Sequence, residues 1–163
     1  MMGKSNSPQL MDLPNEALAR ELKVSVQYMM QHGIEAGRKE AGVQKLSTDE
    51  QCNFVATHWH YFLPGISLKK IAITEMRHAE AITERIVLLG GDPVTQPSNI
   101  KISAIAKTML EDDLEEEREA IELYNRIIEK ARAERDDLTV KLFKFILSDE
   151  ENHFKTFSRL LTS

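Results

Sequence analysis

The chain has 163 residues, of which 42% are hydrophobic and 29% are charged, so it can form one domain with its own core. Its formal net charge of −5 provides no general attraction to nucleic acid or anionic membranes. A single cysteine, Cys52, excludes an internal disulfide, and the sequence has neither an apolar leader nor a membrane-spanning stretch, so we expect a cytoplasmic protein.

Hydrophobic residues recur at intervals of three and four along most of the chain, which predicts four long helices and a short one. The first long helix is expected to begin at Asp12 or Asn15 and to end near Gly42, after a flexible N-terminus over residues 1–11. A short extra helix is expected over about residues 48–62. The other long helices are expected over about residues 66–89, 102–135 and 137–161.

Residues 92–99 contain two prolines and no hydrophobic period, which predicts a loop. An extended connection of this size can run the length of a helical bundle. We therefore predict a single all-α domain over residues 12–161, a four-helix bundle with a long crossover between its second and third long helices. Length alone leaves a bundle with short connections as an alternative.

Polar residues of metal-ligand type occupy positions that the helical period assigns to the core. Two Glu-x-x-His pairs lie in the second and fourth long helices, and a lone glutamate lies in each of the others. The six residues are Glu21, Glu75, His78, Glu117, Glu150 and His153. Spacing of three places the acid and the imidazole of a pair on one face of the helix, where both can bind one metal ion. Glu is common in this chain, so the core placement is more informative than the spacing.

Four ionised carboxylates in a core require compensation, because burial costs several kcal/mol per ion. No lysine or arginine interrupts the apolar stripes that contain them, so we expect the positive charge to come from bound metal. Two ions would balance the carboxylates and leave two neutral imidazoles as nitrogen donors. Oxygen and imidazole donors without thiolate favour iron or manganese, with zinc as a competitor.

Other residues have two interpretations each. Tyr28 and Tyr124 lie seven residues after a candidate ligand, and each is either a core tyrosine or a neighbour of the metals. Asp149 either orients an imidazole or is a solvated acid. Of the acidic run over residues 115–119, only Glu117 is expected to face the metals. A further cluster in the short helix either binds a second metal or redox group or packs as an amphipathic helix: Cys52, His58, Trp59 and His60.

With these ligands, the chain resembles bacterioferritin-type members of the ferritin-like superfamily. The matching runs are EL with QY at residues 21–28, EMRHAE at 75–80 and DEENH at 149–153. A final histidine rather than glutamine is typical of the bacterioferritin type. The resemblance covers all four long helices and implies iron storage in an oligomeric cage.

The resemblance also implies a ligand arrangement and a reaction. Two iron ions per subunit would oxidise Fe(II) with O2 or H2O2. Glu75 and Glu150 would bridge the two ions. The terminal ligands would be Glu21 with His78 and Glu117 with His153.

The chain departs from bacterioferritin in an additional segment over about residues 42–65 and in ending soon after His153. Both departures favour a Dps-like dodecamer over a 24-subunit shell, although that group often has a cysteine pair and this chain has only Cys52. Met76 stands where bacterioferritins bind haem between subunits, and ordinary helix packing is the interpretation we favour. The N-terminus has only Lys4 as a basic residue, so we expect no DNA binding.

Two other functions fit the same six residues. A rubrerythrin-like or other di-iron redox enzyme would be a small oligomer without stored mineral. The absence of a Cys-x-x-Cys motif argues against a built-in electron-transfer chain. A structural bundle with a static zinc or iron pair would show no turnover.

Overall fold

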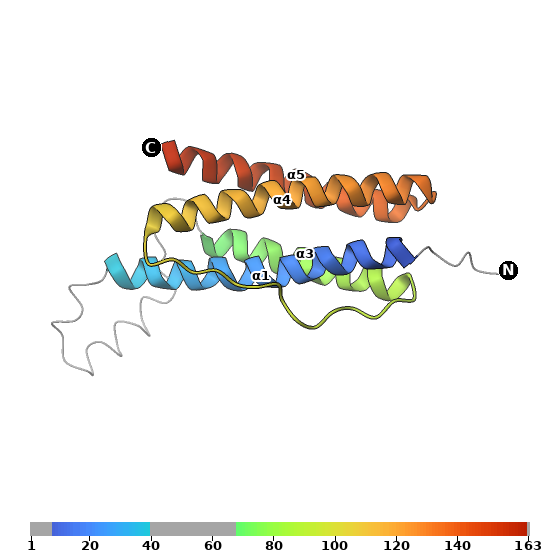
Figure 1. Ribbon diagram of the computed structural model, residues 1–163, viewed down its shortest axis with the longest axis horizontal. Coiled ribbons are helices and arrows are strands. Elements are labelled where there is room, and N and C mark those ends of the chain that lie inside the picture. Colours follow the sequence, from blue (N-terminus) through green and yellow to red (C-terminus); the bar gives the residue numbers. More distant parts are fainter. Residues whose placement is uncertain (1–7, 40–67, 163) are drawn as a thin grey trace.

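A computed structural model describes residues 8–39 and 68–162, which form a bundle of four α-helices (Figure 1). The helices are α1 (Pro8–Lys39), α3 (Leu68–Leu88), α4 (Ala106–Ala133) and α5 (Asp137–Thr162). They confirm the predicted all-α four-helix bundle. None of them combines the length and apolarity needed to cross a membrane. The short helix expected over residues 48–62 lies outside the described residues.

The first helix begins earlier than its sequence signals indicate. α1 starts at Pro8, so Pro14 lies inside the helix and Asn15 does not cap it. The Asn15 side chain instead accepts a hydrogen bond from the backbone N–H of Val94, at 2.9 Å. A polar residue that resembled a helix cap therefore anchors a distant loop.

The crossover, residues 89–105, runs along the bundle and joins two antiparallel helix pairs (Figure 1). α1 packs mainly against α3, and α4 packs mainly against α5. Because the crossover spans the bundle, α3 and α4 point in the same direction. Its backbone is tied to α1 at further points: the Ser98 N–H donates to the Ala19 carbonyl at 2.9 Å, and the Lys101 N–H donates to Gln27 Oε1 at 3.1 Å. The predicted long crossover is confirmed.

Two turns set the helix ends. Gly90, with φ of +82°, ends α3 in a left-handed conformation that favours glycine. Asp136 begins the fourth helix, because its Oδ1 accepts the Thr139 N–H at 3.1 Å. Its Oδ2 also binds Arg85 at 2.7 Å, which ties the end of α3 to the turn between α4 and α5.

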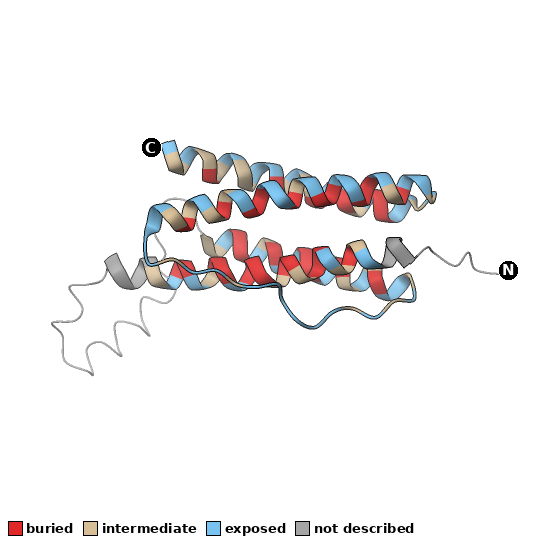
Figure 2. Cartoon of the chain, viewed as in Figure 1, coloured by how far each residue is buried: buried red, intermediate tan, exposed pale blue. Residues whose placement is uncertain are grey.

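Buried residues line the inward faces of all four helices (Figure 2). They form two apolar clusters. The larger includes Leu18, Ile82 and Phe143, and the smaller includes Ile71 and Phe157. Burial of each such side chain contributes about 1.5–3 kcal/mol to the free energy of folding, so the two clusters together stabilise the bundle.

Candidate metal centre

Six side chains of metal-ligand type are brought together from the four helices. α1 and α4 each supply one glutamate, and α3 and α5 each supply a Glu-x-x-His pair. The six are Glu21, Glu75, His78, Glu117, Glu150 and His153. All four glutamates have no exposed surface, and both imidazoles are largely buried. The core positions expected from the helical period therefore lie together in space.

The six residues form two overlapping groups whose ligand atoms lie within 4.8 Å of one another. One group contains Glu21, Glu75, His78 and Glu150, and the other contains Glu75, Glu117, Glu150 and His153. Glu75 and Glu150 belong to both groups. Each group takes three side chains from one helix pair and one from the other, so both pairs are needed for either site.

Both imidazoles turn Nδ1 toward the shared carboxylates. His78 Nδ1 lies 2.9 Å from Glu75 Oε2 and 3.0 Å from Glu150 Oε1. His153 Nδ1 lies 2.8 Å from Glu75 Oε1, without hydrogen-bond geometry. The ring centres are 6.5 Å apart. Nδ1 is therefore the nitrogen that each histidine can offer to a metal.

These contacts shift the protonation of the metal-free centre. Burial raises the pKa of Glu75, but the two imidazoles lower it more, so the net pKa lies below its usual range. Burial lowers the pKa of His78, but Glu150 and Glu75 raise it to about 11. The pKa of His153 is raised, because Glu75 outweighs the effect of burial. Metal binding to Nδ1 would release these protons.

An outer carboxylate holds one imidazole. Asp149 Oδ2 lies 3.2 Å from His78 Nε2, on the opposite side of the ring from the shared glutamates. Such a contact fixes the ring orientation and makes the other nitrogen a better donor. Asp149 therefore lies where the imidazole-orienting interpretation requires it.

The two lone glutamates are held by tyrosines in a reciprocal arrangement. Tyr28 of α1 donates to Glu117 Oε1 of α4 at 2.5 Å, and Tyr124 of α4 donates to Glu21 Oε1 of α1. Both tyrosines are fully buried. Burial, followed by the nearby Glu117 charge, raises the pKa of Tyr28 well above its usual value, which keeps its hydroxyl protonated as a donor. Each carboxylate is fixed through one oxygen, and the other oxygen faces the centre.

A buried arginine corrects the expectation that all of the compensating positive charge comes from bound metal. Arg20 is 6% exposed, and its guanidinium donates to the Glu116 backbone carbonyl at 2.7 and 3.3 Å. It also lies 3.4 Å from Glu21 Oε1, 3.6 Å from Glu117 Oε2 and 3.7 Å from Glu150 Oε2. Burial lowers the Arg20 pKa, but the carboxylates, Glu150 foremost, raise it more and keep the group charged. Part of the compensating charge is thus built into the chain.

The acidic run of α4 is also less solvated than expected. Glu116 is 4% exposed and forms an ion pair with Lys23, which is itself buried. Glu115 and Glu119 face solvent as expected. The missed residues share a signal: Arg20 lies three residues after the buried Ala17, and Lys23 lies three residues after Arg20, on the edge of the buried stripe of α1 that contacts Glu116 of α4.

A second buried polar cluster lies between α1 and α4. Asp113 is fully buried, and its Oδ1 accepts hydrogen bonds from Gln27 Nε2 at 3.0 Å and Gln31 Nε2 at 2.8 Å. Burial raises the pKa of Asp113 to about 7. Asp113 was not predicted from the sequence, although its position four residues before Glu117 places both carboxylates on one face of α4.

The residues fit a pair of metal ions. Several buried carboxylate oxygens have no hydrogen-bond donor: Glu21 Oε2, Glu117 Oε2 and both oxygens of Glu150. Burial and the neighbouring glutamates raise the pKa values of Glu21 and Glu117 well above the usual range. Buried, unpartnered carboxylates are costly, and divalent ions would satisfy both their charge and their lone pairs. Oxygen and imidazole donors suit iron.

Two other sequence candidates lie away from this centre or outside the described residues. Met76, on α3, is 56% exposed at the surface of the chain. The cluster in the predicted short helix lies outside the described residues: Cys52, His58, Trp59 and His60.

Comparisons with known proteins agree with this geometry. The model of the ferritin-like domain family matches residues 52–163. Bacterioferritin from Desulfovibrio desulfuricans is 30% identical over 153 residues, which cover 93% of this chain and 74% of that protein. The structure of that bacterioferritin, which shows its di-iron site in different catalytic states, matches with a TM-score of 0.71 and 28% identity, over 94% of this chain and 78% of its own. The Mycobacterium tuberculosis bacterioferritin BfrA matches with a TM-score of 0.76 and 26% identity, over 99% of this chain and 87% of its own.

Proposed function

Because the chain belongs to the ferritin-like family, as a bacterioferritin-type member, we propose that it oxidises Fe(II) to Fe(III) at the centre inside each subunit and stores the product. The observation that carries this proposal is the pair of four-residue groups sharing Glu75 and Glu150. Two sites with common ligands hold two ions close together, which suits a reaction that needs two electrons.

The six residues have different roles in this proposal. Glu75 and Glu150, which belong to both ligand groups, would be shared by two iron ions, in preference to manganese or zinc. Glu21 with His78 and Glu117 with His153 are the terminal ligands. Two Fe(II) ions held by these residues would supply two electrons as they are oxidised to Fe(III), and with two protons these electrons would reduce O2 to H2O2, or H2O2 to two water molecules. Carboxylates suit both oxidation states, because their oxygens bind a metal singly or in pairs.

The residues around the ligands hold them in place. Tyr28 and Tyr124 each fix one oxygen of a terminal glutamate and leave the other oxygen for metal. Asp149 fixes the ring of His78. This preorganisation lowers the cost of arranging four carboxylates around two ions.

The proposed assembly is a cytoplasmic homo-oligomeric cage. A dodecamer is favoured over a 24-mer by the additional segment over about residues 42–65. Neither DNA nor a membrane is proposed as a partner, because the chain is acidic overall and Lys4 is the only basic residue of the N-terminal ten. Haem at Met76 is not part of the proposal, since exposure of one methionine is compatible with ordinary packing.

The direct test is aerobic Fe(II) oxidation by the purified protein. Glu75→Ala and His153→Ala should lower the initial rate at least about 100-fold, because each removes a ligand. Glu151→Ala, which changes an exposed glutamate beside Glu150, is the matched control and should keep the wild-type rate. Wild-type rates in both ligand variants would contradict the assignment.

Native mass and metal content from one preparation separate the rival functions. A cage that accumulates many iron ions per chain supports storage. A dimer with two iron ions and peroxidase activity would indicate a rubrerythrin-like redox enzyme. Metal that stays bound and unchanged under oxidant would indicate a structural pair.

A further inference from the structure

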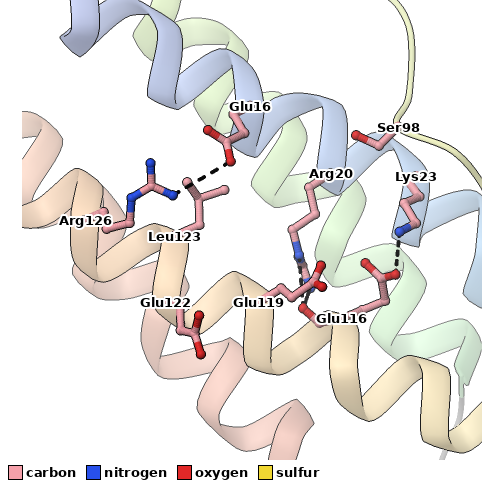
Figure 3. A pocket seen from close by; sticks show the side chains of 9 residues that line it. All are labelled: Glu16, Arg20, Lys23, Ser98, Glu116, Glu119, Glu122, Leu123 and Arg126. Atoms are coloured by element: carbon pink, nitrogen blue, oxygen red, sulfur yellow. Dashed lines mark hydrogen bonds and ion pairs between the residues drawn. The ribbon is translucent and has the colours of Figure 1, made fainter.

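Arg20 separates the carboxylate cluster from a polar pocket of about 340 Å³ between α1 and α4. Figure 3 shows its side chain crossing from α1 to the backbone of α4, next to Lys23 and Glu116. The guanidinium thus forms the inner wall of the pocket and lies beside three candidate metal ligands. It is the only basic side chain of the described residues that has ion pairs with these glutamates, apart from the two histidines.

Hydrogen bonds to the backbone of α4, to Tyr124 and to Glu21 hold Arg20 in place. Nε and one terminal nitrogen donate to the Glu116 carbonyl, and the other terminal nitrogen lies 3.4 Å from both the Tyr124 hydroxyl and Glu21 Oε1. Glu21 Oε1 is thereby occupied, while Glu21 Oε2 has no hydrogen-bond donor. Metal can therefore bind the free oxygen without displacing the guanidinium.

A fixed positive charge alters the electrostatic balance of the centre. Four ionised glutamates and one guanidinium leave three negative charges when the imidazoles are neutral. One divalent ion reduces this to a single negative charge, and a second ion leaves the centre with a net positive charge. The second ion is consequently attracted less strongly than it would be without the arginine, and the metal-free cluster is more easily tolerated.

We propose that Arg20 is a resident counter-ion that stabilises the metal-free carboxylate cluster and weakens binding of the second metal ion. It is a positioning residue, because it acts through Glu21, Glu117 and Glu150. This inference rests on the proposed function for its purpose: a centre that holds its second ion weakly passes iron on to storage. The charge effect itself concerns any divalent ion.

The test uses Zn(II), which binds without oxidation, titrated calorimetrically into the full-length protein. Arg20→Gln should bind the second ion at least about tenfold more tightly than wild type, because a nearby like charge is removed. Arg20→Lys keeps the charge but loses the forked contact with the Glu116 carbonyl, so its second-ion affinity should lie closer to wild type than that of Arg20→Gln. Arg126→Gln is the matched control, since Arg126 lines the same pocket but pairs with the exposed Glu16, at 4.0 Å.

Thermal unfolding supplies the second readout. In chelator, Arg20→Gln should melt below wild type, and excess Zn(II) should close most of that gap. If the variant requires metal to fold, its affinities are obtained by withdrawing Zn(II) from loaded protein with a chelator of known affinity.

Unchanged second-ion affinity in Arg20→Gln would overturn the proposal, as would equal tightening in Arg20→Lys. Absence of Fe(II) oxidation in the wild type would instead refute the proposed function, without affecting the Zn(II) result.

Discussion

The α3–α5 side of the metal centre and the α1–α4 side surround the same carboxylates with different chemistry. On the α3–α5 side, two imidazoles face Glu75 and Glu150, and an outer carboxylate holds one of the rings. On the α1–α4 side, two tyrosines and a buried arginine contact the lone glutamates. The first side supplies groups that can bind metal. The second supplies hydrogen bonds and a permanent charge.

This difference shows how one core can hold four carboxylates both with and without metal. The imidazoles can exchange a proton for a metal ion, so their contribution depends on loading. Arg20 and Tyr28 keep their protons, because the pKa of each is raised, so their contribution does not depend on loading. Substitutions around the imidazoles on the α3–α5 side should therefore change metal affinity alone, whereas substitution of Arg20 on the α1–α4 side should also change the stability of the metal-free protein.

The largest expected effect comes from the residue that both sides share. Glu150 contacts His78 through one oxygen and lies near Arg20 through the other, and it belongs to both ligand groups. Glu150→Gln should abolish tight binding of both ions, whereas Glu117→Gln should leave one. Co(II) absorption titrations would give the stoichiometry. Two tightly bound ions in Glu150→Gln would show that this carboxylate is not a shared ligand.

A smaller effect is expected on the α3–α5 side alone. Asp149→Asn weakens the contact with His78 Nε2 and should lower the affinity of the group containing His78 about 10–100-fold. The group containing His153 should change little. Stepwise Zn(II) calorimetry measures both, with Glu151→Gln as a control for loss of a neighbouring charge. An equal loss at both sites would indicate general disruption of α5.

The smallest effect is expected on the α1–α4 side, and it depends on pH. Asp113 has a pKa of about 7 when folded and about 3.8 when unfolded, so the folded state binds the proton more tightly. Stability is therefore lost as pH rises between these values, by at most about 1.4 kcal/mol per unit.

Asp113→Asn keeps an oxygen acceptor for Gln27 and Gln31 but cannot ionise. It should raise stability at pH 8, by a fraction of the about 4 kcal/mol that the full pKa difference allows because an amide oxygen is a weaker acceptor than a carboxylate, and change it little at pH 4. Thermal unfolding in chelator at the two pH values checks this. An equal change at both would show that ionisation of Asp113 is not the cause.

The helices and the positions of the six ligand-type residues followed from the sequence, because a helical period places every third or fourth residue on one face. Phe143, Ile146 and Phe157 surround Glu150 in the pattern, and all three are buried in the structure. Local spacing was sufficient there, since each prediction concerned one helix at a time.

The residues that the sequence did not predict depend on contacts between helices. Arg20 can be buried because the Glu116 carbonyl accepts its hydrogen bonds and three carboxylates lie beside its charge. Most of these partners lie on other helices, so the pattern of one helix does not reveal them. Asn15 resembled a helix cap by residue type, and its actual partner, in the crossover, could not be recognised because it lies 79 positions away in sequence. Long-range polar partners decided both cases.

The division of the bundle into two helical hairpins gives the centre a mechanical role. Three side chains of each ligand group come from one hairpin and the fourth comes from the other, and a single strap of chain joins the two. A bound ion is therefore a further cross-link between two halves that hydrogen bonds such as the one from Tyr28 to Glu117 already join. Loading should slow the separation of the hairpins and protect core amides from hydrogen exchange. Iron would then hold the two hairpins together as well as being the substrate.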